Sequence, residues 1–273
     1  MSTETASAAG LRHTTPAEPA RLVPAVERAV RILDALAAAP EPIGLAELAR
    51  QLALPKSSLH GLMQTLVATR LAVRYADARF ALGPRPIAWA GHYADTSKIV
   101  AAFESLAARA DALRSETVML AVLDDTDVVY LACRPGTRAL AVNFRAGGRF
   151  PASCTSTGKA ILATMSNERI RARYAGHRLQ RLTRKSAPSM AAFLRMIEAT
   201  RHAGYAADDE ETAEGMHCFG APVKIAGQQD AQAAVAVSLI KAQTSARRRQ
   251  EIIREIQALA AEISARLGAS SER

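Results

Sequence analysis

The feature that most constrains the fold is the order of periodic segments between residues 24 and 82. Apolar residues recur at helical spacing from near Pro24 to before Pro40, then over Leu45–Leu52, then from Lys56 to about Thr69. Two strand-like pieces follow, 71–75 and 79–82, with residues 76–78 as the turn. Three short helices and a hairpin predict a winged helix-turn-helix. The expected inward faces are Val26, Ala29, Val30, Leu33 and Leu36, then Leu45, Leu48, Ala49 and Leu52, then Leu59, Leu62, Met63, Leu66 and Val67.

The third helix carries polar side chains off its apolar stripe, as a helix that enters the major groove requires. Lys56 can neutralise a phosphate or reach guanine, and Gln64 can pair with an adenine edge. Serine hydroxyls and free N–H groups at the helix start can bind phosphates. Residues 21–85 hold nine Lys or Arg against five acids. The predicted DNA-binding residues are Arg28, Lys56, Ser57, Ser58, His60 and Gln64, with Arg74 and Arg79 beside the hairpin tip.

A polar helix face is also compatible with simple solvation, and winged helices also serve as protein-interaction modules. The whole chain has a formal net charge of +9 and a pI of about 9.9, which favours a polyanionic partner without choosing DNA over RNA or an anionic membrane surface. DNA binding is therefore the leading hypothesis, and protein interaction is the alternative. Salt-dependent binding to DNA distinguishes the two.

A change of pattern after residue 83 predicts a second domain. Gly83–Pro86 is the clearest linker, and a helical stretch is expected from about Ile87 to Arg114. Strands and helices then alternate, which indicates an α/β or α+β domain. The expected strands are 118–123, 128–133, 140–144 and 233–239, and the expected helices are 156–165, 167–174, 189–202 and 244–267.

Composition narrows the class of protein. A 49% hydrophobic content is enough for a packed core, and 4% aromatic content with abundant Ala and Leu favours helices over an all-β fold. Three cysteines without a zinc-type spacing favour neither a disulfide framework nor a metal site and fit a reducing cytoplasm. No apolar run is long enough to span a membrane. Residues 1–20 lack the pattern of a secretory signal and are expected to form a disordered tail.

Five ordered motifs resemble the IclR family of bacterial transcriptional regulators, over about residues 22–268. In the N-terminal half these are VERAVRIL at 26–33, LAELA at 45–49 with LPKSSLHGLMQTL at 54–66, and RFALG at 79–83. In the C-terminal half they are STGKAILA at 156–163, and GYAADDEE at 204–211 with Gly215, Cys218, APV at 221–223 and the strand 233–239.

The resemblance implies an α+β architecture, in which a winged helix-turn-helix is joined by a linker helix to a GAF-like effector-binding domain with an antiparallel sheet. The expected boundaries are 21–83 for the DNA-binding domain, 84–98 for the linker and 99–270 for the effector domain. Such proteins are dimers or tetramers on double-stranded, palindromic operator DNA. They respond to a small organic or aromatic acid, and repression is commoner than activation. No cofactor is expected.

The resemblance also places an effector site. Free N–H groups where Ser156, Thr157 and Gly158 open a helix would bind a carboxylate. In similar proteins the segment after the acidic run and the last strand close the same pocket, and here those positions are Asp208, Cys218 and Ser238. The family often has a second hydroxyl two positions before Ser238. This chain has Ala236 there, which favours a less polar or more aromatic ligand.

Enzyme interpretations of the same residues are weaker. Gly158 and Lys159 lack the earlier glycine and the following Ser or Thr of a phosphate-binding loop. The acidic run 208–211 has no partner histidine, and no cysteine has a readable His/Asp arrangement. The chain is therefore predicted not to be an enzyme. The alternative is a small-molecule-processing enzyme with an accessory winged helix, which turnover of the effector would reveal.

Overall fold

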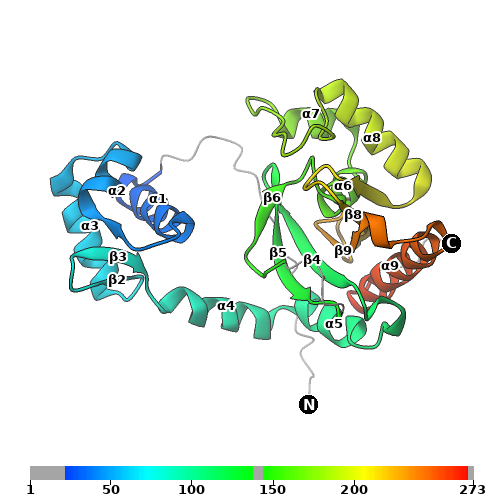
Figure 1. Ribbon diagram of the computed structural model, residues 1–273, viewed down its shortest axis with the longest axis horizontal. Helices are drawn as coiled ribbons and strands as arrows, with labels where there is room; N and C mark the ends of the chain where they lie inside the picture. The colour runs from blue at the N-terminus through cyan, green and yellow to red at the C-terminus, as the bar shows by residue number, and fades with distance from the viewer. Residues whose placement is uncertain (1–21, 138–143, 270–273) are drawn as a thin grey trace, which may run out of the picture. The chain divides into compact units, whose positions relative to one another are not determined.

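The computed structural model describes residues 22–137 and 144–269, which fall into two compact units that divide between Thr96 and Ser97 (Figure 1). The expected tail 1–20 lies outside the described residues, as does the expected strand 140–144 except for Phe144. Each unit has its own hydrophobic core. The division falls inside the predicted linker 84–98.

The N-terminal unit has the predicted order of three helices and a hairpin. Its elements are α1 (Pro24–Ala38), β1 (Ile43–Gly44), α2 (Leu45–Leu52), α3 (Lys56–Ala68), β2 (Ala72–Arg74) and β3 (Arg79–Leu82). A short strand that the sequence did not predict, β1, pairs with β3, so that the wing is a three-stranded antiparallel sheet in the order β1-β3-β2. The tight turn between α2 and α3 depends on Ala53, which adopts a left-handed conformation (φ 53°) two residues before Pro55.

The core of this unit corrects the predicted face of α1. Ile32 and Leu36 are buried against α2, α3 and the wing, whereas Val26 and Val30 are 62% and 51% exposed. Leu36 is buried as predicted, and Ala29 and Leu33 pack against the same core. The buried face is shifted away from Val26 and Val30 toward Ile32, which was not among the predicted inward residues. In α2 and α3 the predicted positions Leu48, Leu59 and Met63 are buried as expected.

The predicted helix from Ile87 to Arg114 is three shorter pieces, α4 (Arg85–Thr96), α5 (Lys98–Ala107) and the 3-10 turn η1 (Asp111–Leu113). The break falls at Ser97, whose extended backbone (φ −80°, ψ 109°) precedes α5. Helix α4 can begin at Arg85 because Pro86 is tolerated in a first helical turn, where its missing N–H needs no partner.

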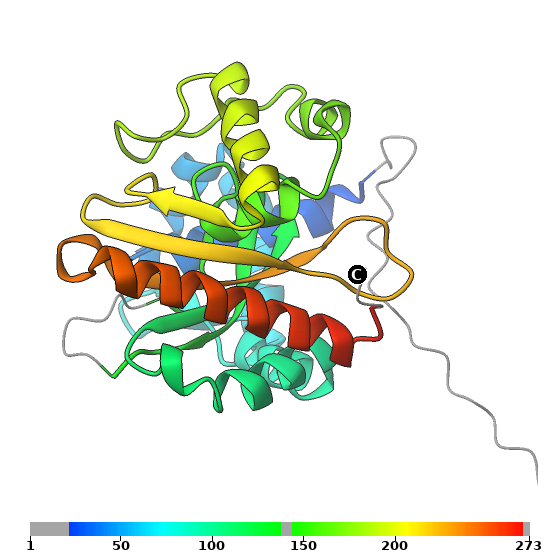
Figure 2. The ribbon, with the colours of Figure 1, turned by 90° about the vertical axis from the view of Figure 1, so that its right-hand side faces the viewer.

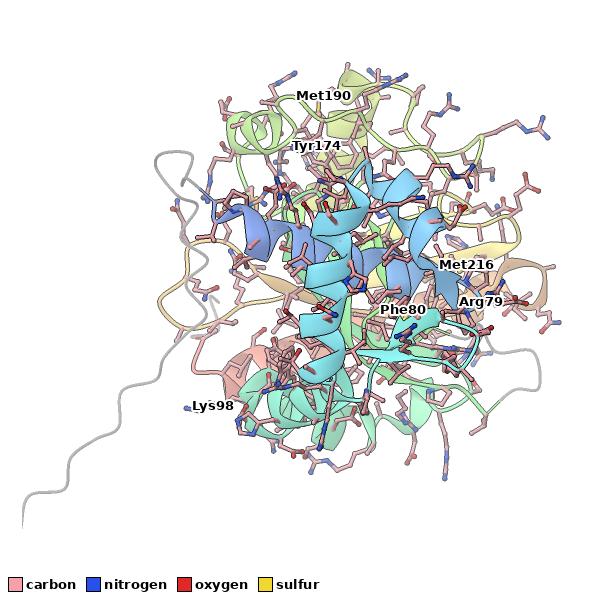
Figure 3. The ribbon with its side chains drawn as sticks, turned by 90° about the vertical axis from the view of Figure 1, so that its left-hand side faces the viewer. Arg79, Phe80, Lys98, Tyr174, Met190 and Met216 are labelled. Atoms are coloured by element: carbon pink, nitrogen blue, oxygen red, sulfur yellow. The ribbon has the colours of Figure 1, made fainter. Side chains whose placement is uncertain are left out.

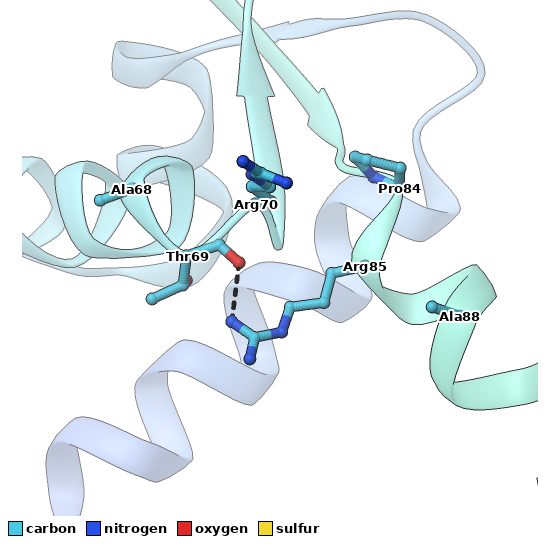
Figure 4. Close-up of a pocket in the computed structure, with 6 residues that line it drawn as sticks. All are labelled: Ala68, Thr69, Arg70, Pro84, Arg85 and Ala88. Atoms are coloured by element: carbon cyan, nitrogen blue, oxygen red, sulfur yellow. Dashed lines mark hydrogen bonds between the residues drawn. The ribbon is translucent and has the colours of Figure 1, made fainter. Parts of the chain in front are cut away.

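Arg85 also joins the linker to the DNA-binding unit. Its guanidinium donates a hydrogen bond of 3.0 Å to the carbonyl of Thr69, where α3 ends (Figure 4). A cation there satisfies a free carbonyl and opposes the negative end of the helix dipole. Gly83 lies beside this contact, and a Cβ on it would come within 2.2 Å of the Arg70 carbonyl oxygen. The chain therefore needs glycine at this position.

The C-terminal unit is built on a six-stranded, wholly antiparallel sheet in the order β6-β5-β4-β9-β8-β7. Its strands are β4 (Thr117–Asp124), β5 (Asp127–Arg134), β6 (Arg149–Pro151), β7 (Ala206–Asp209), β8 (Met216–Val223) and β9 (Ala233–Ile240). This sheet confirms the expected α+β class. Strands β6, β7 and β8 were not predicted. β6 and β7 have only three and four residues, and Pro222 lies inside β8, where it argues against a strand.

Helices cover both faces of this sheet (Figure 2). Helices α5 and α9 (Ala246–Arg266) lie on one face, and α6 (Ser156–Leu162) and α8 (Met190–Ala203) pack on the other with α7 (Asn167–Arg173). Four of these helices start at a Ser or Thr whose hydroxyl accepts a hydrogen bond from an N–H three residues on, namely Thr155, Ser166, Ser189 and Ser245.

We expect Gly83→Ala to destabilise the N-terminal unit, because the added Cβ would meet backbone that cannot move aside. The expected loss is about 1–3 kcal/mol, as for other overpacked sites. Gly61→Ala is the matched control: Gly61 lies inside α3, a Cβ added to it would have nothing within 4 Å, and this change should add about 0.5–1 kcal/mol. Calorimetry of the full chain measures both. Equal melting temperatures for the two variants would contradict the statement that the backbone contact at position 83 requires glycine.

Candidate DNA interface and candidate effector site

The outer face of α3 presents most of the residues predicted to read DNA. Lys56, Ser57, His60 and Gln64 are exposed, and Ser58 is half-buried. Pro55 occupies the cap position before α3 and offers no side-chain cap, so the first N–H groups of the helix remain available to an anion. Phosphate at a helix N-terminus is a common arrangement, and the dipole of this 13-residue helix favours it.

A hollow of about 430 Å³ lies between α3 and the wing and brings three predicted residues together. His60 and Gln64 line it from α3, and Arg74 lines it from β2. Arg74 pairs across the hairpin with Phe80, so both side chains lie on the same face of the wing, toward α3. The wing therefore places a cation beside the predicted base-reading residues of α3.

Arg79 does not join this group. It precedes Phe80 on β3, where Figure 3 labels both residues, and so points to the opposite face of the wing. There it lines a separate hollow with Glu41 and Glu47. Its guanidinium lies 3.9 Å from carboxylate oxygens of Glu41 and Asp77. The sequence showed both arginines near one turn but not that strand alternation separates them. Arg28 is exposed on α1.

The three strand residues of the predicted effector site form one row across the sheet. Asp208 on β7 is directly opposite Cys218 on β8, and Cys218 is opposite Ser238 on β9. Residues that pair across antiparallel strands share a face, so the three side chains lie together. The thiol of Cys218 donates to the hydroxyl of Ser238 at 3.3 Å. All three side chains are buried.

Helix α6 lies close on the neighbouring row of small residues. A Cβ on Gly220 would come within 2.8 Å of the Ser156 carbonyl oxygen, and one on Gly158 within 2.2 Å of the Ala152 carbonyl oxygen. These two glycines let the start of α6 approach both the sheet and the segment before it. Ser156, Thr157 and the strand row therefore belong to one buried region.

The predicted free donors at this helix start are only partly free. Thr155, rather than Ser156, caps α6, and its hydroxyl accepts the N–H of Gly158 at 3.0 Å. Gly158 is thus a packing residue whose N–H already has a partner. The sequence pattern placed the helix start at Ser156 and left this cap out, because Ser156 and Thr155 are both good capping residues.

A buried ion pair that the sequence did not predict closes the region. The Lys159 ammonium on α6 bonds to a carboxylate oxygen of Glu211, and both side chains are almost wholly buried. Asp208 holds the same loop, because it accepts the N–H groups of Glu211 at 2.7 Å and of Thr212 at 3.1 Å. The second carboxylate oxygen of Glu211 is buried without a hydrogen-bond partner among the described residues. Only the fold brings Lys159 and Glu211 together from positions 52 residues apart.

Burial dominates the electrostatics of this region. It raises the pKa of Glu211 to about 7, against the opposing attraction of Lys159, and it raises the pKa of Asp208. Burial also raises the pKa of the Cys218 thiol well above its usual range and that of Cys133 to about 11, and it raises the pKa of Cys154. All three thiols therefore stay protonated at neutral pH and are poor nucleophiles.

Comparison with known proteins identifies the family. Residues 25–75 match the IclR helix-turn-helix domain, and residues 91–265 match the family described as bacterial transcriptional regulator IclR C-terminal. The chain belongs to the IclR family. It is a ligand-responsive transcriptional regulator with a helix-turn-helix DNA-binding domain and a C-terminal effector domain, and the resemblance noted in the sequence is confirmed.

Three IclR-type relatives illustrate the match. The regulator KdgR of Escherichia coli K12 is 26% identical over 260 residues, which cover 90% of this chain and 93% of KdgR. The structure of the Agobacterium tumefaciens repressor BlcR is 35% identical, with a TM-score of 0.58, and the match covers 90% of this chain and 98% of BlcR. An IclR homologue from Microbacterium hydrocarbonoxydans, solved with 4-hydroxybenzoate, is 21% identical with a TM-score of 0.73, over 90% of this chain and 100% of that one.

These relatives are regulators rather than enzymes. Among the helices of residues 22–137 and 144–269, none combines the length and the apolar character that crossing a membrane requires. Over the same ranges, no group of three or more His, Cys, Asp or Glu side chains is arranged to hold a metal ion.

The buried Glu211 predicts a specific pH dependence of stability. Its pKa is raised from 4.5 to about 7 in the folded protein, so the folded state keeps a proton that the unfolded chain releases. Its contribution to stability is therefore greatest in acid and is lost as the pH rises through this window. Glu211→Gln removes the titration, so the melting temperature of the variant relative to the wild type should rise between pH 5 and pH 8.

Glu214→Gln is the control for that measurement, since Glu214 is an exposed carboxylate on the same loop. Its melting temperature relative to the wild type should not change with pH. If Glu211→Gln instead lost stability relative to the wild type as the pH rose, the charged pair with Lys159 would stabilise the fold, and the interpretation of Glu211 would be wrong.

Proposed function

We propose that this regulator is a repressor that binds a palindromic operator as a dimer or tetramer and is released or retained by a small organic or aromatic acid. The observation that carries the DNA-binding part is the exposed face of α3, where His60 and Gln64 line one hollow with Arg74 of the wing and Lys56 is exposed at the start of the helix. The assignment of repression draws on BlcR, whose solved structure is that of a repressor.

The three parts of the interface suit different parts of a DNA site. The uncapped N-terminus of α3, with Lys56, Ser57 and Ser58, suits a backbone phosphate, and Gln64 suits an adenine edge in the major groove. Arg74 suits the backbone beside the groove. A protomer has few such contacts, so two symmetric protomers on two half-sites would supply the affinity and the palindromic preference.

We assign the effector to the buried row of Asp208, Cys218 and Ser238 beneath Ser156 and Thr157. Asp208 and Glu211 both have a raised pKa and so hold their protons more tightly than usual. A protonated carboxyl does not repel a carboxylate, so the region can accept the anion of a small acid. A carboxylate could then take Lys159 as its counter-ion and Ser238 as a donor.

An aromatic acid fits the surroundings best. Tyr130 is buried in the same core as α6, and Phe144 and Phe150 pack against its ring with centroids 5.2 and 5.4 Å away. Ala236 stands where a hydroxyl would otherwise lie, in the row beside Gly220. The homologue bound to 4-hydroxybenzoate shares this fold, and that ligand is the first to test.

The deciding experiment is an anisotropy titration of the full chain against the intergenic DNA beside its own gene. It should be done at two salt concentrations, with and without 4-hydroxybenzoate and succinate. Salt-sensitive binding that exceeds binding to scrambled DNA, and that changes with one acid, is the expected result. Binding no tighter than to scrambled DNA, even against a genome-derived library of fragments, would refute the DNA-binding proposal. Turnover of the acid would point to an enzyme.

Two pairs of substitutions test the α3 interface. Gln64→Ala should weaken operator binding by about 1–3 kcal/mol and relax base preference at one position, whereas Lys56→Ala should weaken binding to all sequences and lower the salt dependence. Arg74→Ala should weaken binding more than its matched control Arg79→Ala, because Arg79 faces Glu41 and Asp77. Equal losses for the two arginines would show that the hollow beside α3 is not the binding surface.

Two further variants test the effector row. Ser238→Ala should weaken the response to the acid while the affinity of the unliganded protein for the operator stays unchanged, and Asp208→Ala should do the same if the loop at Glu211 stays folded. Ala236→Ser restores a hydroxyl and should shift preference from the aromatic toward the more polar acid. An unaltered acid titration in both Ser238→Ala and Asp208→Ala would remove this row as the effector site.

A further inference from the structure

The segment from Asn167 to Lys185 carries an excess of positive charge that neither the DNA interface nor the effector row uses. It holds seven basic residues and one acid, so it supplies most of the chain's formal net charge of +9. It includes α7 and the loop that leads to α8. The basic residues are Arg169, Arg171, Arg173, Arg178, Arg181, Arg184 and Lys185, and the acid is Glu168.

Part of this charge is neutralised and part is not. Arg169 pairs with Asp230, and Lys185 pairs with Glu210 at 2.6 Å. Over the described ranges 22–137 and 144–269, Arg171, Arg178 and Arg181 have no carboxylate within ion-pair distance. All three side chains are exposed, so their charges are available to an anion from solution, which would gain charge-assisted hydrogen bonds from them.

These three arginines line one cavity of about 600 Å³. His177 lines it with them, and its Nε2 lies 3.8 Å from Asp125. Ser189 and Met190, where the 14-residue α8 begins, also line it. Figure 3 labels Tyr174 and Met190, which lie at the two ends of the intervening loop and both line the cavity. A volume of this size suits a small molecule.

Hydrogen bonds from two buried side chains hold the loop that carries Arg178 and Arg181. The Ser186 hydroxyl accepts the N–H groups of Leu182 and Thr183, both at 3.0 Å, and donates to the Glu211 carbonyl at 2.8 Å. The Cys154 thiol donates to the Gln180 carbonyl at 3.4 Å. The loop backbone is therefore preorganised, and a ligand would have to order only the exposed arginine side chains.

We propose that this cavity is a second ligand site, distinct from the effector row, and that it binds a small organic phosphate. Arginine forks match phosphate oxygens in pairs, and three of them call for a ligand with at least two negative charges rather than a monocarboxylate. Leu179, Pro188 and Met190 supply an apolar rim for the organic part. The three arginines line one hollow of small-molecule size, whereas neutralising the phosphates of a duplex calls for cations spread along its backbone.

Calorimetric titration of the full chain with pyrophosphate, at constant ionic strength, tests the site with the anion alone. Wild-type protein should bind pyrophosphate more tightly than phosphate and should show no binding of acetate at this site. The triple variant Arg171→Gln, Arg178→Gln, Arg181→Gln should bind pyrophosphate at least about tenfold more weakly, because it loses charge-assisted hydrogen bonds. Arg195→Gln, an exposed arginine on α8 outside the cavity, is the matched control and should bind as the wild type does.

The melting temperature of the triple variant and its binding to a scrambled duplex complete the test of the phosphate site. The melting temperature of the triple variant without ligand should equal that of the wild type, since the three side chains are exposed and have no carboxylate partner among the described residues, and this shows that the variant is folded. Binding of pyrophosphate with the same affinity by wild type and triple variant would overturn the proposal, as would no binding by the wild type. If the triple variant instead lost affinity for a scrambled duplex while its pyrophosphate binding stayed unchanged, the cluster would be a DNA-backbone contact. None of these results depends on the effector row.

Discussion

The close approach of α6 to the sheet is the constraint on which the C-terminal unit depends. Glycine at positions 158 and 220 removes the side chains that would hold the helix away from the Ala152 backbone and from β8. Lys159 follows Gly158 on the same helix and bonds to Glu211. Burying such a pair costs desolvation, and the pair offsets that cost only if its geometry is good. The fold therefore encloses ionisable groups beside its core, and the desolvation cost is seen in the raised pKa of Glu211.

That region and the strand row form one chemical unit. Asp208 fixes the loop that presents Glu211, and the Cys218–Ser238 hydrogen bond lies beside it on the same face of the sheet. Asp208, Cys218 and Lys159 already have hydrogen-bond partners, so a ligand that bonds to them must displace those contacts, and its binding would change the loop and α6 together. In this way a small acid could alter the conformation of the C-terminal unit, whatever the identity of the acid.

The two units divide the chemistry between them. The N-terminal unit exposes its polar groups on α3 and the wing, where a large polyanion can reach them. The C-terminal unit buries its candidate effector groups under α6 and exposes its strongest charge on α7 and the following loop. The proposed regulator would bind three kinds of anion. DNA would bind on an exposed surface, an acid in the buried effector row, and an organic phosphate in the open basic cavity.

Sequence periodicity by itself determined the winged helix, because the apolar spacing in α2 and α3 reflects local helix geometry. For the second domain it left α/β and α+β open, and the family resemblance favoured α+β. The row of Asp208, Cys218 and Ser238 came from family resemblance, since no local pattern relates three strands. Only the tertiary structure decided which face of α1 is buried, that Arg74 and Arg79 point apart, and that Lys159 meets Glu211. These depend on strand register and helix rotation, which are fixed by packing between segments distant in the chain.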